Sequence, residues 1–184
     1  MSVDSDPFIV VPLNPLRYEP DKAKVKEEKK FIRKHILGQS NEALVKNEKA
    51  MQELRTLGSD LNINAFACNF RINGKANIDV EEANYLNNAI FKRLSITSPK
   101  KNPREIPMFL SATTFKAAEY GECVKHFKER LELETDSNQD LFVLRNVVMS
   151  PFQTAGNFVQ KIADIFQGVL EEEMQVWHIH RMVL

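Results

Sequence analysis

The segment from Leu141 to Phe152 most constrains the fold, because it is a long apolar, β-branched run with a single arginine, Arg145, in its middle. A charge inside such a strand is costly unless it is paired or reaches a site. After the polar residues 153–157, apolar side chains recur at helical spacing: Phe158, Ile162, Ile165, Phe166 and Val169. The pattern predicts a strand followed by a helix with one apolar face.

Two patterned segments lie further upstream. Residues 63–72 alternate, and four of them are expected to face the core: Phe66, Cys68, Phe70 and Ile72. Alternation with a period of two indicates a strand. Asp79 and Glu82 form a capping box for a helix that continues to Leu94, whose apolar residues share one stripe. These two segments therefore predict a strand followed by a helix.

A second strand and helix are predicted between this pair and the arginine-bearing strand. Residues 108–115 read as a strand, and apolar residues recur from Tyr120 to Leu131 at spacings of four, three and four, as in a packed helix. The order after residue 60 is then β-α-β-α-β-α. We expect an α+β fold in which a small sheet of about three to four strands is covered by helices on one face.

The N-terminal residues have a different character. Prolines at positions 7, 12, 15 and 20 allow an extended arm or a single edge strand but no helix. Residues 21–37 predict a largely solvated helix, and residues 41–57 predict a second one that begins after the cap Ser40. We therefore expect an N-terminal arm with two helices over 1–58, an α/β domain over 59–175, and an apolar C-terminal tail over 176–184.

Composition excludes several classes of function. The 25 basic and 25 acidic residues cancel, which argues against nucleic-acid binding. No apolar run approaches the roughly 20 residues that span a bilayer, and the first residues are acidic, unlike a signal peptide. Two cysteines, Cys68 and Cys123, suit a reducing compartment. We expect a cytoplasmic protein without a membrane partner.

Taken in order, these segments resemble the C-terminal small domain of pyridoxal-phosphate-dependent decarboxylases of the aromatic amino acid, tyrosine and glutamate type, which are the group II enzymes of fold type I. The resemblance covers roughly Leu54 to Val169. The sequence of residues 57–66 looks most like that of fungal members. No single segment is specific, but the ordered set is.

The resemblance implies carbon-carbon lyase chemistry on an amino acid, with pyridoxal phosphate as cofactor in the full-length family. In that family the lysine that holds the cofactor lies on a large domain before this one. The pairs Lys34-His35 and Lys125-His126 lie in charge-rich helical surroundings and read as solvated helix faces. We therefore expect a small domain without catalytic, cofactor-binding or metal-binding residues of its own, whose partner is a large catalytic domain or a homodimer partner. The alternative is a stand-alone protein-interaction or binding module derived from that domain.

Arg145 is the one candidate site residue. The resemblance implies an arginine at this place in the last strand, near the junction of the small and large domains. Its guanidinium would bind a substrate carboxylate or a partner segment. The alternative is a structural ion pair with an acidic residue among 79–82 or with Glu122.

Overall fold

The computed structural model describes residues 7–57, 63–98, 101–147 and 157–182. The chain divides into two compact units. The sheet unit comprises Met1–Leu13, Ile63–Val147 and Ile162–Leu184, and the helical unit comprises Asn14–Asn62 and Val148–Lys161.

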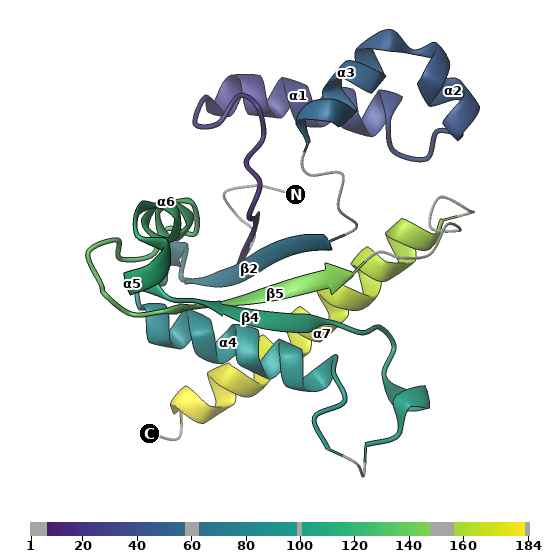
Figure 1. Ribbon diagram of the computed structural model, residues 1–184. Helices are drawn as coiled ribbons and strands as arrows, with labels where there is room; N and C mark the ends of the chain where they lie inside the picture. Colours follow the sequence, from purple (N-terminus) through teal and green to yellow (C-terminus); the bar gives the residue numbers. More distant parts are fainter. Residues whose placement is uncertain (1–6, 58–62, 99–100, 148–156, 183–184) are drawn as a thin grey trace. The chain divides into compact units, whose positions relative to one another are not determined.

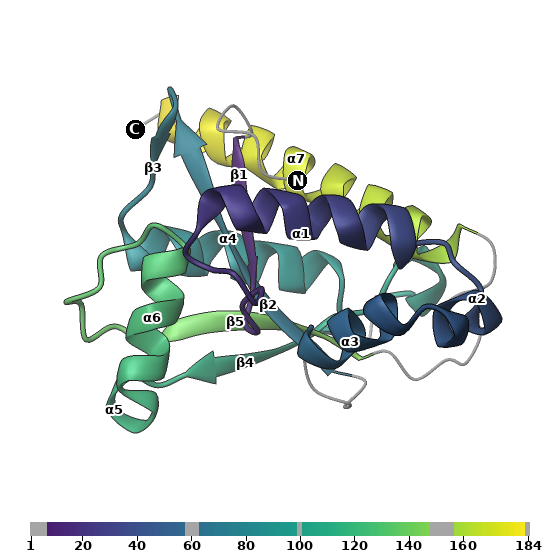
Figure 2. The ribbon, with the colours of Figure 1, turned by 90° about the horizontal axis from the view of Figure 1, so that it is seen from above.

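The sheet unit is built on an antiparallel sheet (Figures 1 and 2). Its strands are β1 (Phe8–Pro12), β2 (Ile63–Ile72), β3 (Lys75–Ala76), β4 (Ser111–Phe115) and β5 (Leu141–Val147). The order across the sheet is β1-β2-β5-β4, and the short β3 pairs with β2. Residues near the N-terminus thus form an edge strand, one of the two forms that their prolines allowed. The predicted α+β class is confirmed.

Helices cover both faces of this sheet. Helices α4 (Val80–Arg93) and α7 (Phe158–Met182) lie on one side, and α6 (Glu122–Arg130) lies on the other (Figure 1). The first core, on the α4 and α7 side, contains Cys68, Phe70, Leu86, Ile90, Leu94, Met108, Leu110, Leu144, Val169, Leu170 and Met174. The second core contains Ala67, Val80, Ala83, Val124, Phe127, Leu131, Leu133, Leu141 and Val143.

The expectation of a single covered face is therefore wrong. Neighbouring residues of a strand point to opposite faces, and Ala67 and Cys68 of β2 are both fully buried. From residue 65 to residue 71, the second face of β2 carries no large apolar residue in the sequence, so it did not read as a core face. The small side chain of Ala67 leaves room for the bulky Phe127 of α6, which belongs to the same core.

The two central strands separate part of the way along their length. Pairing of β2 with β5 runs from Ile63↔Val147 to Phe66↔Leu144. Beyond this point the backbone of Cys68 is paired with a side chain: its N–H donates to Asn87 Oδ1 at 2.9 Å, and its carbonyl accepts from Asn87 Nδ2 at 2.7 Å. The amide of Asn87 thus takes the place of the backbone hydrogen bonds that a neighbouring strand would make with Cys68.

Asn84, one turn earlier on α4, does the same for β5. Its Oδ1 accepts from the Phe142 N–H at 2.7 Å, and its Nδ2 donates to the Asp140 carbonyl at 2.8 Å. Two side chains of α4 thus hydrogen-bond to the backbones of β2 and β5 where these two strands separate. Accordingly, its first turns contribute to the second core and its later turns contribute to the first core.

The ends of several elements differ from the expected bounds. The helix expected from Tyr120 to Leu131 is divided by Gly121, which has a positive φ of 48°, into α5 (Ala117–Tyr120) and α6. The part of the arginine-bearing strand predicted beyond Val147 lies outside the described residues. Helix α7 continues to Met182 and so includes most of the predicted tail. No helix among the described residues combines the length and the apolarity that crossing a lipid bilayer requires.

The helical unit contains α1 (Lys22–His35), α2 (Asn41–Lys46) and α3 (Glu48–Thr56). Ser40 caps α2 as predicted, since its side chain accepts from the Ala43 N–H. The single helix expected over 41–57 is wrong, because Asn47 has an extended backbone that ends α2. The Asn47 side chain then accepts from the Ala50 N–H at 3.1 Å and caps α3.

Candidate functional site

Arg145 lies in the middle of the sheet unit. Its Cα pairs with Ala65 of β2 on one side and with Ser111 of β4 on the other. Directly opposed residues of an antiparallel pair lie on the same face. The three residues therefore share the face of the second core. They lie beside the last pair of β2 and β5 residues, Phe66 and Leu144, before the two strands separate.

Among the described residues, only some of the donors of Arg145 have partners. One terminal nitrogen, Nη2, donates to the carbonyl of Ala112 at 3.3 Å. The Ser111 hydroxyl donates to the Arg145 carbonyl at 3.4 Å. The Nε atom is buried, and among the described residues it has no hydrogen-bond partner. A guanidinium has five N–H donors, so within the described part of the chain this half-buried side chain has spare capacity for an acceptor.

The expected structural ion pair is not formed within the described part of the chain. The ion pairs found there do not include Arg145. The Asp79 carboxylate instead caps α4, where it accepts from the Glu81 N–H at 2.7 Å and from the Glu82 N–H at 3.4 Å. A carboxylate supplied from elsewhere suits the planar fork of Arg145.

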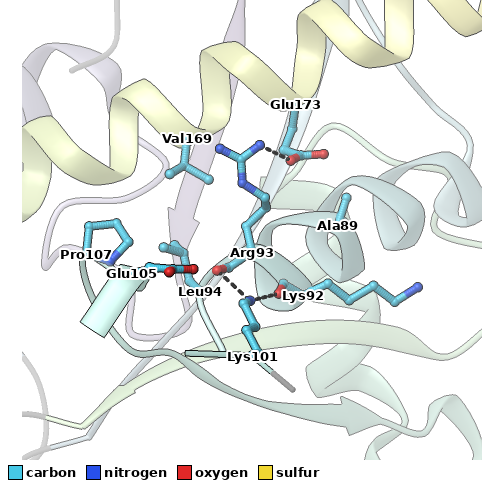
Figure 3. Close-up of a pocket in the computed structure, with 9 residues that line it drawn as sticks. All are labelled: Ala89, Lys92, Arg93, Leu94, Lys101, Glu105, Pro107, Val169 and Glu173. Atoms are coloured by element: carbon cyan, nitrogen blue, oxygen red, sulfur yellow. Dashed lines mark hydrogen bonds and ion pairs between the residues drawn. The ribbon is translucent and has the colours of Figure 1, made fainter. Parts of the chain in front are cut away.

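A pocket of about 440 Å³ lies elsewhere in the sheet unit, at the C-terminal end of α4 (Figure 3). It is lined by Ala89, Lys92, Arg93, Leu94, Lys101, Glu105, Pro107, Val169 and Glu173. Arg145 is not among these residues. Two of the basic side chains have defined partners.

Arg93 forms ion pairs with Glu172 and Glu173 of α7, the latter at 3.1 Å. Lys101 Nζ donates to the carbonyl of Arg93 at 2.9 Å and also to that of Lys92 (Figure 3). It donates to the carbonyl of Ser95 as well, at 2.8 Å. Its ammonium group thus satisfies the last carbonyls of α4, where the helix dipole favours a positive charge. Arg93 and Lys101 are thus already paired within the pocket wall.

Lys128 is a buried lysine that the sequence analysis did not single out. It is 1% exposed, and its Nζ donates to the carbonyls of Ser137 and Gln139, each at 2.7 Å. Burial lowers its pKa, and the nearby Asp140 and Glu134 offset part of that effect. The side chain fixes the loop before β5. It lies one helical turn from the apolar Val124, on the same face of α6, but its charge alone would predict an exposed side chain.

Four of the described lysines are either exposed or bound to backbone carbonyls. Lys34 and Lys125 are exposed, as predicted. Lys101 and Lys128 donate to two or more backbone carbonyls each. The cofactor needs a lysine that is activated beside a cavity and a cradle for its phosphate. Likewise, no group of three possible metal ligands occurs among the described residues.

The fold places the chain among small α+β domains built on an antiparallel sheet. A family model described as "Tyrosine decarboxylase, C-terminal" matches residues 34–174, well over half of the 184 residues. The chain belongs to this family of decarboxylase C-terminal domains. The match begins at the end of α1, so it includes α2, which precedes the start of the sequence resemblance at Leu54. A search of curated proteins found no match.

Proposed function

We propose that this chain is the C-terminal small-domain portion of a pyridoxal-phosphate-dependent amino acid decarboxylase of the fungal group II type, and that it is not catalytic alone. The observation that carries the proposal is the family match over residues 34–174. It is supported by the antiparallel sheet, in which an arginine stands in the strand where the resemblance implies one.

The chemistry of the parent enzyme would belong to another domain. Pyridoxal phosphate acts as an electron sink in such enzymes, and in the family its lysine lies on the large domain. The two buried or half-buried lysines discussed above are held by backbone carbonyls. The proposed partner of this chain is therefore a large cofactor-carrying domain or, by the same resemblance, a homodimer partner.

Arg145 is the proposed contact residue of this domain. Its spare donors would receive a carboxylate of the substrate or of a partner segment. The support is its buried Nε, which has no partner among the described residues, together with the lack of an ion pair there. Because Arg145 is only partly exposed, water and salt would screen such a contact less than one at the open surface.

A titration with pyridoxal phosphate tests the proposal. We expect the purified chain to give only weak, non-saturating absorbance from surface lysines and no release of carbon dioxide from tyrosine or related amino acids. A Lys128→Met variant serves as the control for the buried amine. A stoichiometric aldimine band that a single lysine substitution abolishes would contradict the proposal.

The alternative function is a stand-alone interaction module. It is favoured by exposed apolar side chains on the sheet unit, including Ile78, Tyr85 and Phe109, which are 67%, 61% and 52% exposed. Exposed apolar patches mark interfaces when they are contiguous. A reading frame that extends upstream of Met1 into a large domain would favour the decarboxylase portion over the stand-alone module. For either function we propose a cytoplasmic location.

A further inference from the structure

Glu28 has an unusual place in α1. The helix is dense in Lys and Glu, yet among its described residues Glu28 alone is buried, with 5% exposure. Its Oε1 accepts a hydrogen bond from the backbone N–H of Arg17 at 3.1 Å. Its Oε2 is also buried and has no hydrogen-bond partner in the described part of the helical unit. A buried carboxylate oxygen without a donor is costly.

A second carboxyl group with the same feature lies on α3. Oε1 of Glu53 is buried and likewise lacks a donor among the described residues. Helices α1 and α3 contact each other (Figure 2), and the side chains of Glu53 and Glu28 are close enough to hydrogen-bond. Two ionised carboxylates offer only acceptors. A hydrogen bond between them therefore requires a proton on one of them.

The environment of Glu53 also favours a proton on one of the two carboxyl groups. Burial, the hydrogen bond to Glu28 and the negative charge of Glu28 raise the pKa of Glu53 above its ordinary value, and Arg17 offsets part of the rise. Among the described residues, Glu28 from α1 and Arg17 from the segment before α1 are the charged groups that act on Glu53. A second acid beside a partly buried carboxyl group is a known way to keep that group protonated.

We propose that Glu28 and Glu53 share one proton, and that this proton fastens α3 to α1. The helical unit is then a proton-sensitive element that packs more tightly in acid than at neutral pH. The inference is independent of the proposed function, because it concerns the packing of the helical unit and not the sheet-borne Arg145.

The sign of the pH effect follows from linkage. A group whose pKa is higher in the folded than in the unfolded state stabilises the fold fully below its unfolded value, here 4.5, and loses that contribution as the pH rises through the folded value. While the unit holds one proton more than its open form, the opening equilibrium changes by at most about tenfold per pH unit.

Amide hydrogen exchange of the full chain, corrected for intrinsic rates, tests the proposal. We expect protection of α1 and α3 to fall as the pH is raised from 5 to 8. Glu53→Gln should abolish this dependence, because a neutral amide donates the hydrogen bond at every pH, and should keep at pH 8 the protection that the wild type shows at pH 5. The matched control is Glu27→Gln, an exposed neighbour on α1, which should keep the wild-type dependence.

A wild type without the pH dependence, or a Glu53→Gln variant that retains the full wild-type slope, would overturn the proposal. A second measurement covers the case in which the variant does not fold. In the wild type, carbon-detected NMR of the glutamate carboxyl groups should show one group that titrates clearly above 4.5. If every carboxyl group titrates at or below that value, no shared proton exists.

Discussion

The backbone of Cys68 depends on a single side chain. Asn87 is fully buried, and its amide pairs with both polar backbone groups of Cys68 and also donates to the Ala83 carbonyl at 2.7 Å. Few residues can do this, because the amide carries donor and acceptor on one short, planar group. The identity of residue 87 is therefore set by hydrogen bonding and not by helix propensity.

We expect Asn87→Ala to lower the free energy of unfolding by about 2–4 kcal/mol, since it leaves a buried N–H and a buried carbonyl without partners. Asn138→Ala, at an exposed loop position, is the control and should change it by less than about 0.5 kcal/mol. Urea denaturation followed by circular dichroism measures both. Equal stabilities for the two variants would show that β2 does not need the hydrogen bonds from Asn87.

Arg145 should respond differently from a residue in a structural ion pair. Arg145→Met keeps the apolar stem and removes a buried Nε that has no partner among the described residues, so we expect a change in unfolding free energy within about 1 kcal/mol. Arg145→Ala should cost about 1–2 kcal/mol more through lost packing. Thermal melts of the two variants check this. A loss of several kcal/mol for the methionine variant would indicate an ion pair after all.

The sequence predicts the roles of some of these residues and not of others. Arg145 could be singled out because a charge in an apolar strand is conspicuous. Asn84 and Asn87 could not, because their roles depend on the separation of two strands that are far apart in the chain. Glu28 and Lys128 were hidden among other charged residues on their helices, where only the tertiary structure decides which one is buried.

Most of the helices and strands of the sheet unit were predictable. The alternation of β2, the capping box of α4 and the apolar stripe of α7 each carry their own signal. The structure has β2 and α4 close to the predicted bounds, whereas α7 continues further, to Met182. The breaks at Asn47 and Gly121 were missed, because the apolar spacing continues across each of them. Periodicity thus identifies an element better than it identifies an interruption.

The attachment of α7 rests on apolar burial more than on charge. Leu170 is 3% exposed in the first core, whereas Arg93 and Glu172, which pair across α4 and α7, have side chains that are 45% and 60% exposed. Exposed ion pairs contribute little because water screens them.

We therefore expect Leu170→Ala to cost about 2–4 kcal/mol of unfolding free energy and Arg93→Gln to cost less than about 1 kcal/mol. Guanidinium denaturation of both variants makes the comparison, and the exposed Gln167→Ala on the same helix is the control. A larger loss for Arg93→Gln than for Leu170→Ala would mean that the charged pair dominates the contact.

At the scale of the whole molecule, the fold class followed from the order of patterned segments. The second covered face did not, because it depends on contacts between segments that local patterns do not relate. The family match agrees with the resemblance in kind and extends further toward the N-terminus.

The pairing of β1 with β2 has a consequence for how copies of this chain meet. The nearest paired residues, Pro12 and Phe66, are more than fifty positions apart, so β1 closes a long loop whose entropy opposes its docking. Whenever β1 leaves, it exposes a strand edge of β2 that the same segment of another copy fits equally well. Strand exchange between molecules then competes with self-pairing, and the outcome depends on protein concentration.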